Sequence, residues 1–362
     1  MCNPRISYKN PAFSDIENMR RLWKITFNDT DDYLNIIFSN YINLDSCIVA
    51  YSDAELIAML IGIPYKFVVN KHYITGLYLC GLSTLKPYRG QGIMSNMLDM
   101  IKVISRKYSY DFTFLIPADS HLRNYYSKLG YYNSSHINKY AITHTSLFTQ
   151  ETIADRYKIW EEYLSYGHRI TVEVGEMEVS VYGREMITDC VIMDLANSLH
   201  LCEASTPGNH IIHTSIDWYL ILEEKLLSGY LLFFSSDFSL VFMMNIDGEI
   251  ELLRGEIPLV SELLGVVFSD VSCDDNSSMD VNFRDHGDSN ILIDETMELY
   301  GMVRFEKEYS NNFLEKFKGS ENRIFERECG VVNKYGKINS HENDGELNSR
   351  IASTIRFRCM LD

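Results

Sequence analysis

The segment Arg89-Gly90-Gln91-Gly92 has residue types and a spacing that suit the binding of an anion. It follows an apolar run at 73–82, which is typical of a buried strand, and it precedes Ile93, Met97 and Ile101, which recur at helical spacing. A strand, a short turn and a helix point several backbone N–H groups at one spot, where the helix dipole also favours a group such as pyrophosphate. Because glycine has no Cβ, Gly90 and Gly92 would let a phosphate approach the backbone closely. The alternative is that both glycines serve only the bend.

A second strand–helix unit follows the first. The apolar run 112–117 predicts the strand, and Asp119 is suited to be the N-cap of the next helix. This helix contains Tyr126-Ser127-Lys128-Leu129-Gly130-Tyr131, in which Gly130 suits a left-handed C-cap. The two motifs therefore lie in consecutive strand–helix units.

Together the two motifs resemble the signatures of the GNAT superfamily of N-acetyltransferases. One superfamily signature is Arg/Gln-x-x-Gly-x-Gly/Ala after the fourth strand, and the other is Tyr-x-Lys-x-Gly-Phe/Tyr on the helix after the fifth. Residues 89–92 and 126–131 match them in order and at suitable separation. Met94 departs from the usual Gly or Ala. With this bulky residue and its long C-terminal region, the sequence resembles the branch of the enhanced intracellular survival acetyltransferases.

The resemblance implies acetyl-CoA as co-substrate and assigns residues to it. The implied cofactor-binding residues are Leu82, Ser83, Thr84, Arg89, Gly90, Gln91, Gly92, Ile93, Met94 and Ser95. Strand amides at 82–84 would hold the pantetheine and acetyl group, and backbone amides at 89–95 would hold the pyrophosphate.

The resemblance also implies two catalytic groups. Tyr126 corresponds to the general acid that protonates the leaving thiolate, and a tyrosine pKa of ~10 is close to that of a free thiol. The alternative is a helix tyrosine packed against the sheet. No Glu or Asp lies on strand 73–84 to act as the base. In the survival branch the terminal carboxylate enters the site, so Asp362 is the candidate base; the alternative is a frayed chain end.

Apolar periodicity predicts an α/β (α+β) fold with a mixed, mainly antiparallel sheet flanked by helices, as in the GNAT fold. In the first half we expect strands at 5–9, 46–52, 55–64, 66–70, 73–82, 112–117 and 132–143, and helices at 15–27, 33–41, 91–109 and around 126.

A change to acidic composition near residue 145 and a polar stretch after Arg304 together predict three parts. Residues 1–145 are expected to be the acetyl-CoA-binding catalytic domain, 146–305 a second GNAT-like domain, and 306–362 a C-terminal extension. In the second domain we expect helices at 151–166, 215–227 and 258–268, strands at 169–182, 187–194, 229–235 and 239–245, and a hairpin at Asp247-Gly248. The following segment, 253–258, lacks a second Gly-x-Gly loop, so this partial copy is expected to bind no acetyl-CoA of its own.

The charge distribution and the cysteine spacing limit the kinds of ligand that the chain is expected to bind. The 362-residue chain carries a net charge of −17. Residues 1–150 hold 15 basic and 11 acidic residues, a net of +4, so the remaining 18 basic and 39 acidic residues give −21. A mildly basic front half suits an anionic cofactor, whereas an acidic back half attracts cations and repels nucleic acid; the alternative is acidity for solubility. The 8 cysteines form no Cys-x-x-Cys pair, and neither a metal site nor a membrane span is expected.

Two functions follow from the resemblance. The first is a bacterial-type, cytoplasmic N-acetyltransferase that acts on a small amine such as a polyamine or an aminoglycoside. The second is a non-catalytic acyl-CoA-binding or regulatory module that keeps the fold. Release of CoA with a panel of amines discriminates them. The sequence is compatible with a homo-oligomer as well as with a monomer.

Overall fold

The computed structural model describes residues 5–69, 71–134, 136–143, 149–167, 169–174, 176–208, 210–269, 280–284 and 291–305. The contacts among these residues separate two compact units. The first holds the described residues of Met1–His136, Pro207–Ile212 and Leu299–Cys359, and the second those of Ile137–Thr206 and His213–Glu298.

The first unit is built on one sheet. Its helices and strands are β1 (Ile6–Lys9), α1 (Ile16–Phe27), α2 (Asp31–Ile36), β2 (Ile48–Ser52), β3 (Glu55–Val69), β4 (His72–Thr84), α3 (Ile93–Tyr108), β5 (Phe112–Leu115), α4 (Ser120–Ser127), β6 (Tyr132–Asn133), β10 (His210–Ile212) and β16 (Met302–Phe305). The strand order is β1-β2-β3-β4-β5-β16-β6, with β10 paired to β3. The β4–β5 pair is parallel and the others are antiparallel. The predicted mixed, mainly antiparallel sheet is confirmed.

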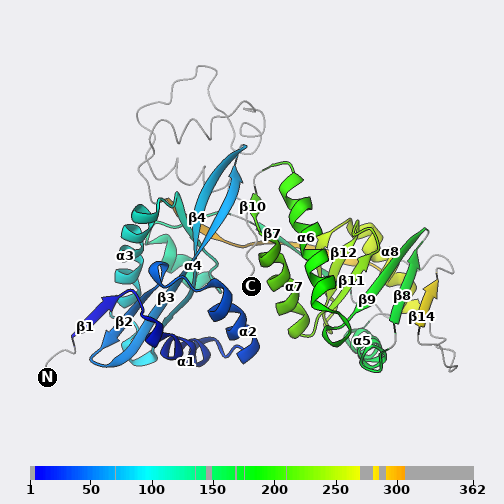
Figure 1. The fold of residues 1–362 in the computed structure, drawn as a ribbon, viewed down its shortest axis with the longest axis horizontal. Coiled ribbons are helices and arrows are strands. Elements are labelled where there is room, and N and C mark those ends of the chain that lie inside the picture. The colour runs from blue at the N-terminus through cyan, green and yellow to red at the C-terminus, as the bar shows by residue number, and fades with distance from the viewer. Residues whose placement is uncertain are drawn as a thin grey trace, which may run out of the picture. The chain divides into compact units, whose positions relative to one another are not determined.

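The long hairpin of β3 and β4 forms the middle of this sheet (Figure 1). On one face, Leu77 and Leu79 of β4 pack in a buried cluster with Ile93 and Met97 of α3. Successive side chains of a strand point to opposite faces. The other face of β4 is covered by α1, whose Trp23 lies against the strand and is 4% exposed. Helices therefore bury both faces of β4, the strand that leads to the glycine turn.

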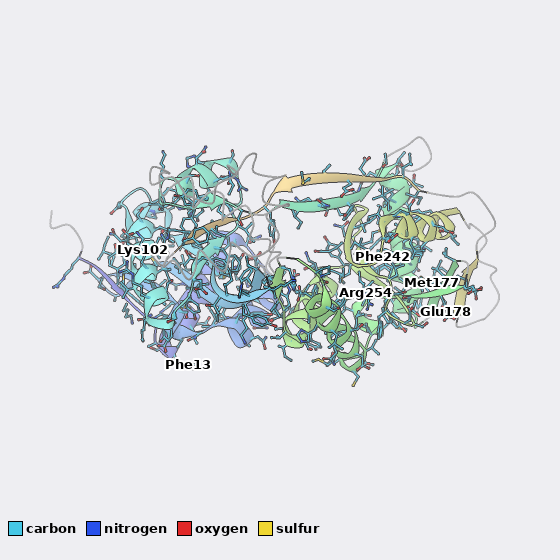
Figure 2. The ribbon with its side chains drawn as sticks, turned by 90° about the horizontal axis from the view of Figure 1, so that it is seen from above. Phe13, Lys102, Met177, Glu178, Phe242 and Arg254 are labelled. Atoms are coloured by element: carbon cyan, nitrogen blue, oxygen red, sulfur yellow. The ribbon has the colours of Figure 1, made fainter. Side chains whose placement is uncertain are left out.

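The second unit contains a separate sheet. Its elements are β7 (His136–Ile142), α5 (Gln150–Ser165), β8 (Arg169–Val174), β9 (Met177–Tyr182), α6 (Asp189–Ser205), α7 (Ser215–Leu227), β11 (Leu231–Ser235), β12 (Val241–Met244), β13 (Glu249–Arg254), α8 (Ile257–Ser269), β14 (Asp280–Arg284) and β15 (Ile293–Leu299). The strand order is β14-β8-β9-β11-β12-β13-β7-β15. Phe233 of β11 stacks on Phe242 of β12 at 4.5 Å between ring centroids, and this core also holds Trp160 of α5. Figure 2 labels Phe242 among the side chains of this unit.

Most local predictions in the second unit are confirmed. The expected helix 215–227 is α7. The Asp247-Gly248 turn joins β12 and β13, with Met244 opposite Ile250 and a positive φ of 78° at Gly248. The strand expected at 187–194 is wrong, because α6 begins at Asp189. Its buried side chains recur three and four residues apart, which is helical spacing: they are Ile192, Leu195, Ala196 and Leu199.

The strand expected at 132–143 is wrong as a single element. It divides into β6, which pairs with β16, and β7, which pairs with β13 of the other sheet. The first unit also extends beyond the expected range 1–145, because β10 and β16 pair with its strands. The expected range of the second domain, 146–305, includes both strands, because local sequence patterns do not identify distant pairing partners. The division into independently folding domains stays a prediction, and 306–362 lies outside the described residues.

Candidate functional site

A β-bulge interrupts β4 where the acetyl group is expected. The register of β4 against β3 shifts by one residue between Cys80 and Ser83. Gly81 and Leu82 therefore lie opposite a single residue of β3, which bends the strand. Gly81 has a positive φ of 59°, and a Cβ added there would lie 2.5 Å from Cζ3 of Trp23. Only glycine fits this position without a shift of the neighbouring indole.

The ladder between β4 and β5 ends before the bulge. The parallel ladder runs from Gly76 opposite Phe112 to Tyr78 opposite Phe114, and β5 ends at Leu115. Among the described strands, none continues the ladder on this side of residues 79–84. None of the described strands therefore covers this side of Leu82 and Ser83, where the resemblance places the acetyl group, whereas the Thr84 carbonyl oxygen accepts a hydrogen bond from Arg89.

The glycine turn after β4 is shaped by two side chains that bond to the backbone. Nε of Arg89 donates a hydrogen bond to the carbonyl oxygen of Thr84 at 2.9 Å, and Nε2 of Gln91 donates one to that of Pro87 at 3.2 Å. Gly90 and Gly92 both have a positive φ, 77° and 76°, and an added Cβ at either would have no heavy atom within 4 Å. The turn is thus left-handed and open to solvent at both glycines.

The start of α3 supplies the donors that an anion needs. Gly92 is the N-cap and offers no side chain to cap the helix. The first helical hydrogen bond runs from Asn96 N to Gly92 O at 3.0 Å, so the N–H groups of Ile93, Met94 and Ser95 have no acceptor within the helix. These donors, the helix dipole and the open glycines fit the pyrophosphate of acetyl-CoA.

The side chains of the first turn of α3 have other roles. Ile93 is 2% exposed and lies in the core, and Met94 packs against the same core. The bulky residue at 94 is therefore accommodated by packing. The Ser95 hydroxyl lies 3.2 Å from the Tyr125 hydroxyl of α4. Residues 93 and 94 would therefore bind an anion through their backbone N–H groups. The contact between Ser95 and Tyr125 joins the first turn of α3 to the helix of the second motif.

Tyr126 lies on α4, close to the turn's helix. Oδ1 of Asp119 accepts a hydrogen bond from Leu122 N at 2.7 Å, which confirms the predicted N-cap. Tyr126 is 7% exposed, and its ring centroid lies 5.2 Å from that of Tyr125 and 5.9 Å from that of Tyr131. Burial raises the pKa of Tyr126 above its usual value, and the neighbouring tyrosines and Asp119 raise it further. Its hydroxyl is therefore protonated at neutral pH, and the same shift makes it a weaker proton donor than a tyrosine in water.

The structure places the candidate acid but not the candidate base. Asp362 lies outside the described residues. Asp15 is buried near β1, but its carboxylate is engaged by Tyr51, Lys9 and the Ala12 N–H at 2.6, 2.9 and 2.7 Å. Burial alone would raise the pKa of Asp15, but these hydrogen bonds hold it below its usual value. This carboxylate is committed to the fold.

Two features of the site were missed by sequence reasoning. The first is the bulge, for which the signal was an isolated glycine, Gly81, inside an apolar strand. The second is the aromatic support behind it, in which Trp23 Nε1 donates to Oδ2 of Asp29 at 2.7 Å. The rings of Phe27, Tyr33 and Phe38 lie 5.2 to 6.3 Å from the indole. This packing fixes the indole that lies against the bulge.

We expect Gly81→Ala to destabilise the first unit. A left-handed backbone disfavours a Cβ by roughly 1–2 kcal/mol, and overpacking against Trp23 adds about 1–3 kcal/mol. Gly90→Ala is the matched control, because φ is again positive but space is open. Urea unfolding should give a clearly larger loss of unfolding free energy for Gly81→Ala. Equal losses would show that the indole yields without cost.

The glycine before α8 in the second unit differs from those before α3. Gly255 has a positive φ of 111°, but a Cβ added there would lie 2.6 Å from Cδ1 of Leu240. Its left-handed turn is therefore packed by a side chain, whereas Gly90 and Gly92 face open space. No second Gly-x-Gly accompanies it.

The bulged strand, the open glycine turn and the helix that follows define the first unit as a GNAT acetyltransferase fold. Residues 7–133 match the family model described as the acetyltransferase (GNAT) domain. This match supports acyl transfer as the general class of reaction. No curated protein matches the chain.

Solved structures of similar fold cover most of the chain. Eis1 from Mycobacterium abscessus is 8% identical, with a TM-score of 0.51 over 84% of this chain and 74% of that one. A probable N-acyltransferase from Enterococcus faecalis is 13% identical, with 0.51 over 86% and 74%. A GCN5-related N-acetyltransferase from Anabaena variabilis is 12% identical, with 0.50 over 84% and 73%. At such low identity the likeness shows the fold.

Neither a membrane-spanning helix nor a cluster of metal ligands occurs among the described residues. None of the helices that the structure describes combines the length and the hydropathy of a membrane span. Within these residues, no three His, Cys, Asp or Glu side chains gather as metal ligands would.

Proposed function

We propose that the protein is an acetyl-CoA-dependent N-acetyltransferase that transfers the acetyl group to a small, cationic amine by direct attack in a ternary complex. The observation that carries the proposal is the open turn at Gly90 and Gly92, where backbone N–H groups at the start of α3 lack helical acceptors. It lies directly after the bulge in β4, before which the ladder with β5 ends. One end of the site thus suits a pyrophosphate and the other a thioester.

The proposed chemistry needs few protein groups. The amine nitrogen attacks the thioester carbonyl, the new C–N bond forms as the C–S bond breaks, and the leaving thiolate takes a proton from Tyr126. The support for this role is the place of Tyr126 in the second motif, on α4 and in the same buried cluster as the start of α3. Its raised pKa keeps the hydroxyl protonated but makes it a weaker acid than a tyrosine in water. The base that accepts the amine proton is proposed to be a carboxylate of Asp362.

The proposed acceptor is a cation because of the charge distribution. Residues 151–362 carry a net of −21, whereas residues 1–150 carry +4. An acidic surface raises the local concentration of a polyamine or aminoglycoside. We also propose membership of the enhanced intracellular survival branch and a cytoplasmic location. The resemblance of the motifs and the likeness of fold to Eis1 from Mycobacterium abscessus support the branch.

A second candidate is a binding module without turnover. The observation that favours it is that β4 carries no carboxylate to act as base. Release of CoA, measured with a thiol reagent and a panel of polyamines, aminoglycosides and neutral amines, tests both. Amine-dependent release establishes the enzyme. Tight CoA binding without release from any amine would establish the module.

We expect the Michaelis constant of a polycationic amine to rise severalfold as salt is added. Attraction between exposed charges is screened beyond ~8 Å at physiological ionic strength. The Michaelis constant of a neutral amine, measured with the same enzyme, is the control and should change little. The same salt dependence for both amines would contradict electrostatic selection by the acidic half.

A further inference from the structure

Arg304 reaches the interior of the acetyltransferase unit from a distant part of the chain. It lies on β16, which pairs with β5 on one side and with β6 on the other. The register places Arg304 opposite Thr113 of β5, so the two side chains share a face of the sheet. Arg304 is only 6% exposed. An arginine is rarely fully buried unless its guanidinium is paired.

The side chain of Arg304 holds a tyrosine of the second motif. Its guanidinium carbon lies 4.8 Å from the ring centroid of Tyr131, and its Nη2 donates to the Leu98 carbonyl oxygen of α3 at 3.0 Å. The Tyr131 hydroxyl lies 3.1 Å from that of Thr113. Tyr131 is therefore fixed at its face by a cation and at its hydroxyl by a second residue of the same sheet face.

Tyr131 in turn lies against Tyr126. The two rings are 5.9 Å apart with an interplanar angle of 66°, an edge-on contact. The backbone N–H of Tyr131 also donates to the carbonyl oxygen of Tyr126 at 3.2 Å. The position of the Tyr126 ring thus depends on a neighbour whose own place is set by Arg304.

We propose that Arg304 is a positioning residue for Tyr126 and acts through Tyr131. The inference rests on the proposed acetyl transfer, in which Tyr126 is the acid. The planar cation suits the role for two reasons. It covers an aromatic face, and it reaches a backbone carbonyl of α3, the helix that begins at the glycine turn. The strand that completes the sheet thereby also orients the catalytic side chain.

The test is a double-mutant cycle on the full chain. Arg304→Met keeps much of the side-chain volume, and we expect it to lower turnover by roughly 10- to 100-fold, as small misplacements of catalytic groups do. The Michaelis constant for acetyl-CoA should stay unchanged. Arg304→Lys, which retains a cation and a donor, should recover part of the loss. In a Tyr126→Phe background, Arg304→Met should cause no further loss, because no acid is left to misplace.

A control and a readout apart from activity complete the design. Arg106→Met removes an exposed arginine of α3 and should leave turnover unchanged. The NMR signals of the Tyr126 ring, observed with labelled tyrosine, should shift in Arg304→Met and not in Arg106→Met. If Arg304→Met does not fold, Arg304→Lys and Thr113→Val carry the same comparison.

Three results would be decisive. Unchanged Tyr126 signals in Arg304→Met overturn the positioning role. The same fold-loss of turnover in wild-type and Tyr126→Phe backgrounds also overturns it, because it indicates a general structural effect. If the Tyr126 signals shift in Arg304→Met but Tyr126→Phe is fully active, Arg304 does position Tyr126. That result would contradict only the role of Tyr126 as the general acid in the proposed function.

Discussion

Gly92→Glu is expected to abolish binding of acetyl-CoA while the protein stays folded. Gly92 is exposed, it caps α3, and a side chain there would enter the space where the pyrophosphate is expected. Two like charges ~4 Å apart repel by roughly 4 kcal/mol at an effective dielectric of ~20. A loss of this size corresponds to about a thousandfold in affinity. Titration calorimetry with CoA measures it directly.

The control for this prediction is Gly167→Glu. Gly167 also has a positive φ, 84° against 76°, and also has open space at its Cβ position. The substitution therefore adds the same backbone strain and the same charge at a glycine that does not belong to the turn. Both variants should lose similar unfolding free energy, and only Gly92→Glu should lose CoA. Unchanged CoA affinity in folded Gly92→Glu would exclude the turn as the pyrophosphate site.

Tyr126→Phe is expected to lower turnover far more than it lowers cofactor affinity. A single general acid typically contributes ~10²–10⁴-fold to the rate. The ring remains, so its packing against Tyr125 and Tyr131 should be retained. Steady-state kinetics and CoA calorimetry on the same preparation separate the two effects. Turnover within about threefold of wild type, far below that range, would make Tyr126 a packing residue.

Tyr110→Phe is the matched control, since Tyr110 is also buried in this core and lies outside both motifs. It should leave turnover unchanged. The pH dependence gives an independent check. Burial raises the pKa of Tyr126, so its neutral form, which donates the proton, persists as the pH rises from neutral toward ~10. Wild-type turnover should therefore not fall in that range through loss of this proton.

Local signals in the sequence were sufficient for the elements of the site. The run before Arg89 predicted β4, and Asp119 and Gly130 predicted the two ends of the second motif's helix. These predictions succeed because hydrophobic periodicity, helix caps and left-handed glycines determine the structure of residues only a few positions away in the sequence. The roles of Leu82–Thr84 and Tyr126 came from the resemblance and stay predictions.

What depends on distant residues could not be read from local patterns. β16 is four residues long, and its Met-Val-Arg-Phe sequence does not identify β5 as its partner. The bulge needs Trp23 from α1 to explain why Gly81 is glycine. From local sequence alone, Arg304 indicates the end of an apolar run. Its burial is explained by the cation contact with Tyr131, a residue distant in the sequence.

The pairing of β16 has a consequence for the order in which the chain folds during synthesis. β6 ends at Asn133, but the strand that lies between it and β5 begins at Met302. At ~5–20 residues per second, the ribosome needs roughly 10–30 s to make the intervening chain. During that interval the edges of β5 and β6 are unpaired, and unpaired edges promote aggregation. A nascent chain, or a fragment that ends near residue 145, would therefore depend on chaperones more than its local helices and hairpins suggest.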